Sequence, residues 1–316
     1  MPGPGSYWIG EEEKAQVLEV LESGHVSRYG DLDDPRFQQK VLTFEQEFAA
    51  FTGARFCQAT SSGTSTLLIS LRAVGVGQGD EVIVPTYTFI ASYGAPIFLG
   101  AVPVLTDIDE SLCIDPEDIE RRITPRTKAI MPVHIIGNPC DMDAVMDVAD
   151  RHGIPVVEDC CQACGASYKG RSVGRFGLMG GFSLNIYKTI TAGDGGMLIT
   201  DDEELYAHAF GLTDQGYKKK DGRLGPVPPS ILGLNFRITE LTGAIALAQV
   251  RKLPAILESL RRKKARLKAA IGGGTTSTMT ARVTSVTPPT GSDTCTVRSR
   301  VTPSRSWPLA GRHAAR

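Results

Sequence analysis

Residues 128–159 read KAIMPVHIIGNPCDMDAVMDVADRHGIPVVED and contain a strand, a helix and a second strand in succession. The apolar runs at 128–135 and 154–159 predict buried strands. Between them, Asp141 predicts the N-terminal cap of a helix that ends near Gly153. Two strands joined in this way are typical of the parallel unit from which α/β folds are built.

The same alternation extends upstream of this unit. Apolar runs at 81–85 and 102–108 predict two further strands, and Asp115-Pro116 combines a helix cap with proline at the first helical position. The chain is therefore expected to form an α/β domain with a mostly parallel central sheet sandwiched by helices. In such sheets ligands bind outside the carboxyl ends of the strands, so we expect the active residues directly after strands.

Two amphipathic helices are predicted to open the chain, and each ends at a glycine. Their apolar stripes are Val17, Leu18 and Leu21 before Gly24, and Phe44, Phe48 and Phe51 before Gly53.

The segment after Arg237 loses the alternating pattern. The sequence ITELTGAIALAQVRKL predicts a long helix, Pro254 predicts a break, and a second helix ends in the basic run RRKKARLK at 261–268. This basic run is interpreted as a solvated helix face, because no aromatic residues lie among its charges to stack on nucleic-acid bases.

Three segments are predicted from these patterns: a large domain at 1–237, the start of a small C-terminal domain of long helices at 238–271, and an aberrant tail at 272–316. The tail is rich in Thr, Ser, Arg and Pro and has no apolar periodicity, which predicts disorder. Its abrupt onset favours a frameshifted or truncated reading frame, with a natural flexible tail as the alternative.

Charge and composition exclude several classes of protein. The 316 residues carry 34 Lys and Arg against 35 Asp and Glu, so no overall field recruits nucleic acid or anionic lipid. The N-terminus lacks the basic start and apolar core of a signal peptide, and no apolar run approaches the roughly 20 residues that span a bilayer. A soluble, cytoplasmic protein is expected, with no nucleic-acid or membrane partner.

Three of the seven cysteines, Cys160, Cys161 and Cys164, lie too close together to form a disulfide framework. A metal or redox site at Cys161-x-x-Cys164 is one interpretation. No second Cys or His pair stands at zinc spacing, so small buried packing residues are preferred and no metal is expected.

Two segments carry residues suited to binding an anion and a cation. Ser61-Ser62-Gly63-Thr64 follows a predicted strand at 55–60 and opens a helix, so its backbone N–H groups form a candidate phosphate site. Taken alone the motif favours an ordinary helix cap, because any strand-to-helix turn is rich in Ser, Gly and Thr. Glu158 and Asp159 end a buried strand, where a carboxylate is costly without a positive partner. That partner is either a protonated ring nitrogen of a cofactor or, alternatively, a helix N-terminus or an arginine.

A lysine supplies the third candidate group. Lys188 comes just after a short predicted strand and just before a Gly-rich turn at 193–196. Desolvation in such a place lowers the pKa of a lysine amine and suits it to Schiff-base chemistry, although a lone lysine is usually a surface residue.

Together these motifs resemble the DegT/DnrJ/StrS family of sugar aminotransferases. The resemblance covers about residues 7 to 270 and rests on PTYTF at 85–89, EDCCQACGASYKG at 158–170 and FSLNIYKTITAGDGG at 182–196, in order with SSGT, PVHIIGNPCDMD and GLNFR. It implies the fold-type-I architecture of aminotransferases that use pyridoxal 5'-phosphate (PLP), with a large α/β domain and a smaller C-terminal domain. It also implies a homodimer with shared active sites.

The resemblance implies a role for each matching residue. Lys188 matches the lysine that holds PLP as a Schiff base and moves the proton, and Asp159 matches the acid that faces the pyridine nitrogen. The other matches are Gln162 beside the phenolic oxygen, Phe89 stacked on the ring, Gly63, Thr64 and Ser183 at the phosphate, and Asn235 at the phosphate of the partner subunit.

The implied reaction moves an amino group from glutamate or glutamine to an acceptor, which is either a nucleotide-linked keto sugar or a keto-cyclitol. The implied context is secondary-metabolite or surface-glycan biosynthesis. A PLP-dependent sugar dehydratase of similar sequence is disfavoured because that branch carries histidine in place of Lys188. A disabled PLP-binding remnant or regulatory protein is a further alternative, since the small domain is incomplete here. A dinucleotide-binding dehydrogenase ranks last, because no G-x-G-x-x-G follows the first strand.

Overall fold

The computed structural model describes residues 2–220, 223–226 and 231–272 of the chain. The chain divides into a compact unit, Met1–Leu267, and a second unit that begins at Lys268. The α/β layers and the candidate site both belong to the first unit. The predicted domain boundaries after residues 237 and 271 stay predictions, and the predicted tail lies outside the described residues apart from Gly272.

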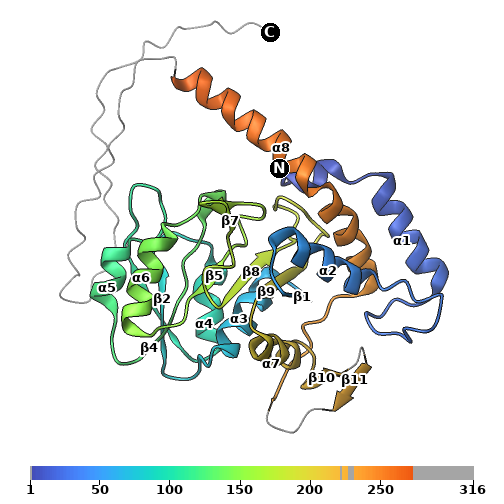
Figure 1. Ribbon diagram of the computed structural model, residues 1–316, viewed down its shortest axis with the longest axis horizontal. Coiled ribbons are helices and arrows are strands. Elements are labelled where there is room, and N and C mark those ends of the chain that lie inside the picture. Colours follow the sequence, from blue (N-terminus) through green and yellow to red (C-terminus); the bar gives the residue numbers. More distant parts are fainter. Residues whose placement is uncertain (1, 221–222, 227–230, 273–316) are drawn as a thin grey trace, which may run out of the picture. The chain divides into compact units, whose positions relative to one another are not determined.

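The centre of the compact unit is a mixed but mostly parallel sheet (Figure 1). Its strands occur in the spatial order β3, β2, β4, β5, β8, β9, β1, with parallel bridges Ile130 to Val156 and Val133 to Asp159 joining β4 to β5. Only β9 runs antiparallel to its neighbours in this sheet. The strands are β1 (Phe56–Thr60), β2 (Glu81–Pro85), β3 (Val102–Thr106), β4 (Thr127–Ile130), β5 (Val157–Asp159), β8 (Met179–Ser183) and β9 (Gly196–Thr200).

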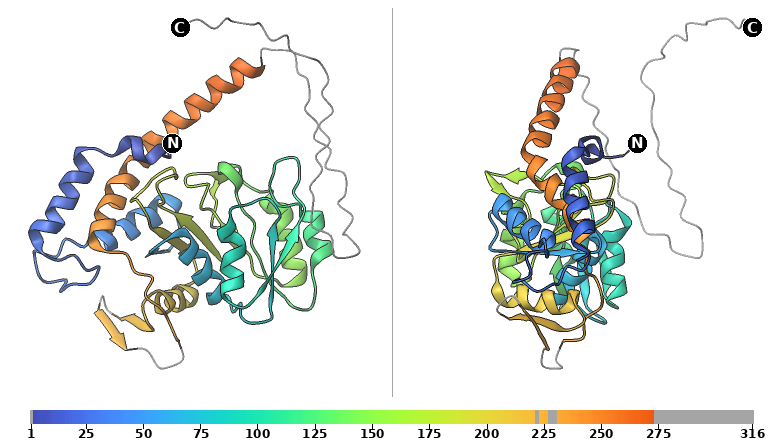
Figure 2. Two further views of the ribbon diagram at one scale, coloured as in Figure 1. Left: turned by 180° about the vertical axis from the view of Figure 1, so that it is seen from behind. Right: turned by 90° about the vertical axis from the view of Figure 1, so that its right-hand side faces the viewer.

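Helices cover both faces of this sheet (Figures 1 and 2). On β2, Ile83 packs with Ile119 and Val145 of two helices on one face, whereas Val82 and Val84 pack against helices on the other, as alternation along a strand requires. The predicted sandwich is confirmed. The helices are α1 (Glu11–Ser23), α2 (Lys40–Thr52), α3 (Gly63–Ala73), α4 (Ile90–Phe98), α5 (Pro116–Arg122), α6 (Met142–His152), α7 (Glu203–Thr213) and α8 (Glu240–Gly272), with short 3-10 helices η1 (Pro4–Trp8) and η2 (Ile135–Gly137). Two small hairpins complete the elements: β6 (Ser167–Tyr168) with β7 (Arg171–Ser172), and β10 (Tyr217–Lys220) with β11 (Arg223–Pro226).

The predicted helix caps are confirmed, whereas several strands are shorter than expected. Asp115 and Asp141 accept hydrogen bonds from the first turns of α5 and α6, and Gly153 ends α6 in the left-handed conformation. Strand β4 ends at Ile130 rather than at residue 135, because Pro132 has no N–H to donate to the ladder. Strand β3 likewise ends at Thr106, after which Asp107 N–H donates to Asp118 of α5.

The predicted burial of the α1 stripe is wrong, although the helix has the expected bounds. Leu18 and Leu21 are each 54% exposed, while Glu13 and Val20 are buried. The helix buries its other face because the Glu13 side chain points inward and accepts hydrogen bonds from Gln249 and Lys252 of α8. In α2, Phe44 and Phe48 are buried as predicted, and Phe51 is partly exposed.

The predicted break at Pro254 is also wrong. Helix α8 continues through it, and Leu253 and Ile256 on either side are buried in one apolar cluster with α2 and the sheet. Burial on both sides of the proline outweighs the cost of a lost helical hydrogen bond, about 3 kcal/mol. The basic run at 261–268 is exposed, as a solvated helix face should be. Within the described ranges, no helix combines the length and apolar character needed to cross a bilayer.

Candidate active site

A cavity of about 1000 Å³ lies at the carboxyl ends of several strands. Its wall includes Ser62 after β1, Phe89 after β2, Asp159 at the end of β5, and Ser183 at the end of β8. The predicted site residues thus meet where strands end, because parallel strands present their carboxyl ends at one edge of the sheet. Seven of the eight predicted site residues line this cavity: Gly63, Thr64, Phe89, Asp159, Gln162, Ser183 and Lys188.

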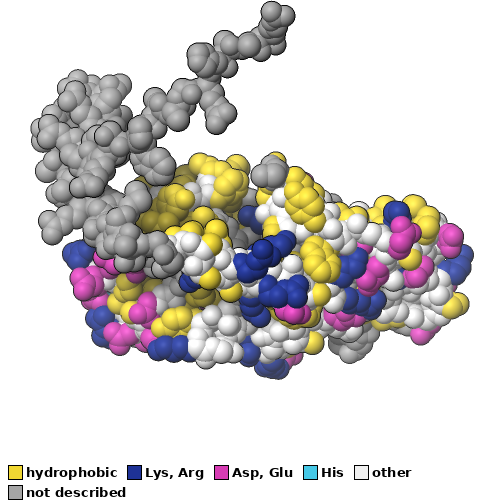
Figure 3. Space-filling model, turned by 90° about the horizontal axis from the view of Figure 1, so that it is seen from above, with side chains coloured by type: hydrophobic (Ala, Val, Ile, Leu, Met, Phe, Trp, Pro, Cys, Tyr) yellow, Lys and Arg dark blue, Asp and Glu magenta, His cyan; other side chains and the backbone are white. Residues whose placement is uncertain are grey.

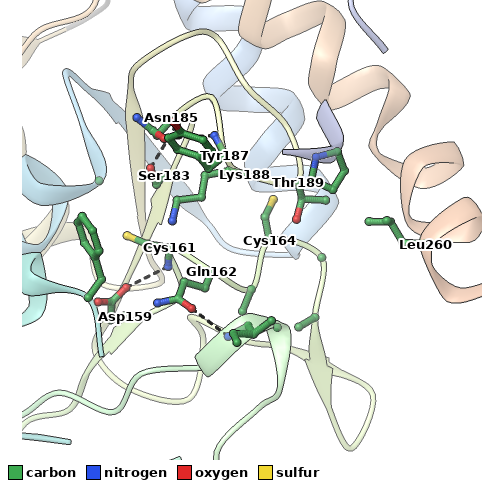
Figure 4. A pocket seen from close by; sticks show the side chains of 18 of the residues that line it. Asp159, Cys161, Gln162, Cys164, Ser183, Asn185, Tyr187, Lys188, Thr189 and Leu260 are labelled. Carbon is green, nitrogen blue, oxygen red and sulfur yellow. Dashed lines mark hydrogen bonds between the residues drawn. The ribbon is translucent and has the colours of Figure 1, made fainter. Parts of the chain in front are cut away.

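The lysine stands on the loop between β8 and β9. Figure 4 shows its side chain extending toward Asp159, Cys161 and Gln162. Within the described part of the chain, the ammonium group of Lys188 has no hydrogen bond or ion pair, although its backbone N–H donates to Asn185 O at 2.9 Å. The backbone of Lys188 is therefore fixed by a hydrogen bond, whereas its amine can bind a ligand in the cavity.

Asp159 is buried at the cavity wall with part of its hydrogen-bonding capacity unused. Its Oδ2 accepts from Ser92 Oγ at 2.7 Å and its Oδ1 accepts from Cys161 N–H at 3.0 Å. A carboxylate can accept about four hydrogen bonds, so Asp159 is oriented and still able to meet a donor from the cavity.

The start of α3 forms a cradle for an anion. Ser62 caps the helix by accepting from Ser65 N–H, whereas the N–H groups of Gly63 and Thr64 donate to no acceptor among the residues described here. A Cβ on Gly63 would lie 2.7 Å from Ser183 Cβ and 2.9 Å from Cys161 Sγ. Only glycine therefore leaves space beside the Ser183 hydroxyl, and free N–H groups at a helix N-terminus suit a phosphate.

Gln162 and Phe89 occupy two further parts of the cavity wall. Gln162 Oε1 accepts from Ile136 N–H at 3.0 Å, which leaves its amide NH₂ free to donate to a ligand oxygen. Phe89 precedes α4 and exposes 63% of its surface at the cavity. An aromatic ring in this position can cover the face of a planar ligand.

Asn235 is the one predicted residue that the structure does not bring to this cavity. Its side chain is exposed, and its Oδ1 accepts from Arg237 N–H at 3.3 Å. The resemblance assigns it to the cofactor of a partner subunit, and that role stays a prediction.

Glu158, the neighbour of Asp159 in β5, forms a buried hydrogen-bonded pair with His134. Glu158 accepts from three backbone N–H groups, those of Gly174, Phe176 and Gly177, at 2.6–2.8 Å. His134 accepts from Cys140 N–H through Nδ1, so its Nε2 carries the hydrogen that it donates to Glu158 at 3.0 Å.

This cluster bears on metal binding. His134, Glu158 and Cys160 offer ligand atoms close together. However, both oxygens of Glu158 and both nitrogens of His134 already have hydrogen-bond partners. These contacts fit a structural pair that fixes the loops around it.

The three clustered cysteines have different surroundings. Cys160 is fully buried, in line with the predicted packing role, whereas Cys161 and Cys164 both line the cavity. Burial, reinforced by the neighbouring carboxylate of Asp159, raises the pKa of Cys161 well above its usual range, and burial raises that of Cys164 to about 12. Both thiols are therefore protonated at neutral pH and poorly nucleophilic.

Several residues that line the cavity or contact a residue of its wall were not anticipated from the sequence. Ser92, which orients Asp159, lies inside a helix with no motif to mark it. Asn185 and Asp194 pair across the lysine loop at 2.9 Å, and both belong to the quoted FSLNIYKTITAGDGG stretch. Arg261 and Lys264 of α8 also line the cavity, although the basic run suggested only a solvated face.

These residues fit PLP. The free N–H groups and Gly63 opening suit its phosphate, the unsaturated Asp159 carboxylate suits its ring nitrogen, and the unpaired Lys188 amine suits its aldehyde carbon.

Comparison with known proteins agrees with this arrangement. GDP-perosamine synthase of Caulobacter vibrioides is 40% identical over 251 residues, which are 79% of this chain and 64% of that protein. The aminotransferase structure from Psychrobacter cryohalolentis shares 38% identity with a TM-score of 0.71, covering 78% of this chain and 63% of that one. The NtdA structure from Bacillus subtilis, with bound cofactor PMP, shares 32% identity with a TM-score of 0.67, covering 78% and 54%.

These matches establish a fold-type-I architecture, although this chain spans less than two thirds of each of these relatives. The family match covers residues 8–288 and so extends past residue 270, where the resemblance was expected to end. The chain belongs to the DegT/DnrJ/EryC1/StrS aminotransferase family.

Proposed function

We propose that this chain is a PLP-dependent aminotransferase that moves an amino group from glutamate or glutamine to a keto sugar. The observation that carries the proposal is the amine of Lys188, which has no partner among the described residues and extends into a cavity toward Asp159. An unpaired lysine amine, an open acidic acceptor and a helix N-terminus in one cavity are the groups that PLP requires.

The cofactor supplies an electron sink for the negative charge that develops on the substrate carbon when a proton is removed. The protein supports this chemistry through Asp159, which would keep the ring nitrogen protonated. Ser92 Oγ and Cys161 N–H hold the carboxylate in place, so no reorganisation is needed when charge develops.

Lys188 is proposed to act as the proton carrier. Its Nζ would take the proton from the carbon of the amino donor and return it to the reacting carbon of the cofactor. The absence of an ion-pair partner among the described residues favours this role, because a paired ammonium holds its proton more strongly.

The cavity also bears on the acceptor. Arg261 and Lys264 place two cations on the wall formed by α8, where a diphosphate would be attracted. Together with the similarity to GDP-perosamine synthase, this favours a nucleotide-linked keto sugar over a keto-cyclitol.

A homodimer with shared active sites is part of the proposal. Large apolar side chains lie exposed both at the cavity, as Phe89 does, and at the far end of α4, where Phe98 exposes 82% of its surface. Hydrophobic side chains also gather on the face seen in Figure 3. Such patches commonly mark protein interfaces. Three of the exposed apolar residues, Phe89, Ile136 and Tyr187, line the cavity, whereas Tyr87, Ile90, Ile97 and Phe98 precede or belong to α4.

A cytoplasmic location is proposed as well. Six cysteines in the described part of the chain are free thiols, which suits a reducing compartment.

The test is an absorbance spectrum of the purified chain with PLP, before and after glutamate or glutamine is added. We expect a visible band that depends on Lys188 and that the donor removes. Lys188→Ala should lose the band, whereas Lys14→Ala, which changes an exposed lysine of α1, should keep it.

A Lys188-dependent band that neither donor removes would indicate a PLP-binding protein without transaminase activity, the disabled alternative. Absence of any such band in the folded wild-type chain would overturn the proposal.

A further inference from the structure

The first residues of the chain lie along the loop that carries Lys188. Gly3 N–H donates to Ile186 O at 2.9 Å, and Gly5 N–H donates to Lys188 O at 3.3 Å. These two bonds hold the peptide group that precedes Tyr187 and the one that follows Lys188. We call residues 2–6 the N-terminal strap.

The strap approaches the loop too closely for side chains. A Cβ on Gly3 would overlap the carbonyl group of Tyr187 and lie 2.7 Å from Lys188 N. A Cβ on Gly5 would lie 2.8 Å from Ile190 Cα. The nearest atom in each case belongs to the backbone, so no change of rotamer relieves the overlap and the loop itself would have to move.

The strap is itself held in shape. Pro4 begins η1 with a fixed φ angle and lines the cavity. Ser6 donates to Gly3 O through both its backbone N–H and its hydroxyl, at 3.2 and 2.7 Å. At the other end of η1, Trp8 O accepts from Lys252 of α8 at 3.0 Å.

A buried polar network fastens the far end of the same loop. Thr191 N–H donates to Gln249 Oε1 at 3.3 Å, and Gln249 Nε2 donates to Glu13 Oε1 at 2.8 Å. Glu13 also accepts from Lys252 and from Gly10 N–H. All three of Thr191, Gln249 and Glu13 are buried, so helices α1 and α8 and the lysine loop are tied together away from water.

From these contacts we propose that the N-terminal strap is a positioning element that fixes the Lys188 peptide so that the amine can reach the reacting carbons. Gly3 and Gly5 act through the lysine loop and touch no substrate. The catalytic consequence rests on the proposed function, whereas the mechanical coupling of strap and loop does not.

Hydrogen exchange of the full chain without cofactor tests this coupling directly. We expect amides 186–191 in Gly3→Ala to exchange about tenfold faster than in wild type, while the α6 amides at 142–152 stay unchanged. Gly94→Ala in α4 is the matched control, because a Cβ at Gly94 meets no atom within 4 Å and should leave the loop protected. Equal loop exchange in the two folded variants would overturn the proposal.

Pro4→Gly covers the case in which Gly3→Ala fails to fold. It adds no atoms and only loosens the strap, so we expect exchange in the loop to rise by a few-fold. Unchanged loop exchange in Pro4→Gly would contradict the coupling.

With PLP and donor present, both strap variants should also lose the visible band more slowly than wild type. An unaltered rate in a variant with faster loop exchange would overturn the catalytic part. If the wild-type chain shows no band, the proposed function fails while the exchange result still decides the coupling.

Discussion

Glu158 and Asp159 are neighbours at the end of β5, and both are buried, yet their surroundings differ in kind. Glu158 accepts four hydrogen bonds, three from backbone N–H groups and one from His134. Asp159 accepts two from the residues that the structure describes, and it lines the cavity. The strand alternation sends the two side chains to opposite sides. A carboxylate whose hydrogen-bonding capacity is fully used stabilises the fold; we call it saturated. A carboxylate that faces a cavity with capacity left over, which we call unsaturated, can bind a ligand.

Replacing the unsaturated carboxylate should give the largest effect. Asp159→Asn keeps the shape but removes the charge that would hold a protonated ring nitrogen. We expect donor-driven turnover to fall by about a thousandfold with little change in melting temperature, measured by half-reaction kinetics and calorimetry. A variant that melts early while its folded fraction reacts normally would break the distinction between the two carboxylates.

The complementary change is Glu158→Gln. Removing the charge from a buried, fully hydrogen-bonded pair should lower the free energy of unfolding by about 3 kcal/mol, measured by denaturant titration. Glu117→Gln is the control, because the Glu117 side chain is 88% exposed. Unfolding free energies equal in the two variants would show that the saturated site contributes no stability.

The anion cradle can be narrowed without altering either carboxylate. Gly63→Ala places a Cβ 2.7 Å from Ser183 Cβ, so affinity for PLP should fall by about tenfold or more in an equilibrium titration. Gly94→Ala in α4, where a Cβ meets nothing within 4 Å, should bind normally. Unchanged affinity in Gly63→Ala would place the cofactor's phosphate elsewhere.

Glu13 extends the comparison to a third buried carboxylate. Burial raises its pKa, but hydrogen bonds from Lys252, Gln249 and Gly10 outweigh this and lower it below the ordinary value of 4.5. The resulting stability is present above pH 4.5 and is lost as the pH falls through the lowered folded value. Between about pH 5 and 3, wild type should lose a few degrees more in melting temperature than Glu13→Gln. Parallel pH profiles would contradict this.

The sequence was sufficient to predict the alternating architecture because apolar runs, caps and end glycines act locally. Asp115, Asp141 and Gly153 mark helix ends through contacts within a few residues. The sequence motifs likewise identified seven residues of the cavity wall.

Local patterns failed where distant segments compete. The spacing of apolar residues predicts which face of α1 is buried. However, Gln249, 236 residues away from Glu13, provides a buried hydrogen-bond partner, so the face that carries Glu13 is buried instead. The helix break predicted at Pro254 does not occur, because burial of apolar residues on both sides of the proline keeps α8 continuous.

By itself, then, the sequence determined the fold class and the chemical groups of the site, since both follow from short-range periodicity and recognisable motifs. Only the tertiary structure decided which groups remain available. Ser92 contacts Asp159, and the N-terminal strap contacts the Lys188 loop, from distant parts of the sequence. Whether a buried group has all its hydrogen-bonding capacity used depends on every segment packed around it.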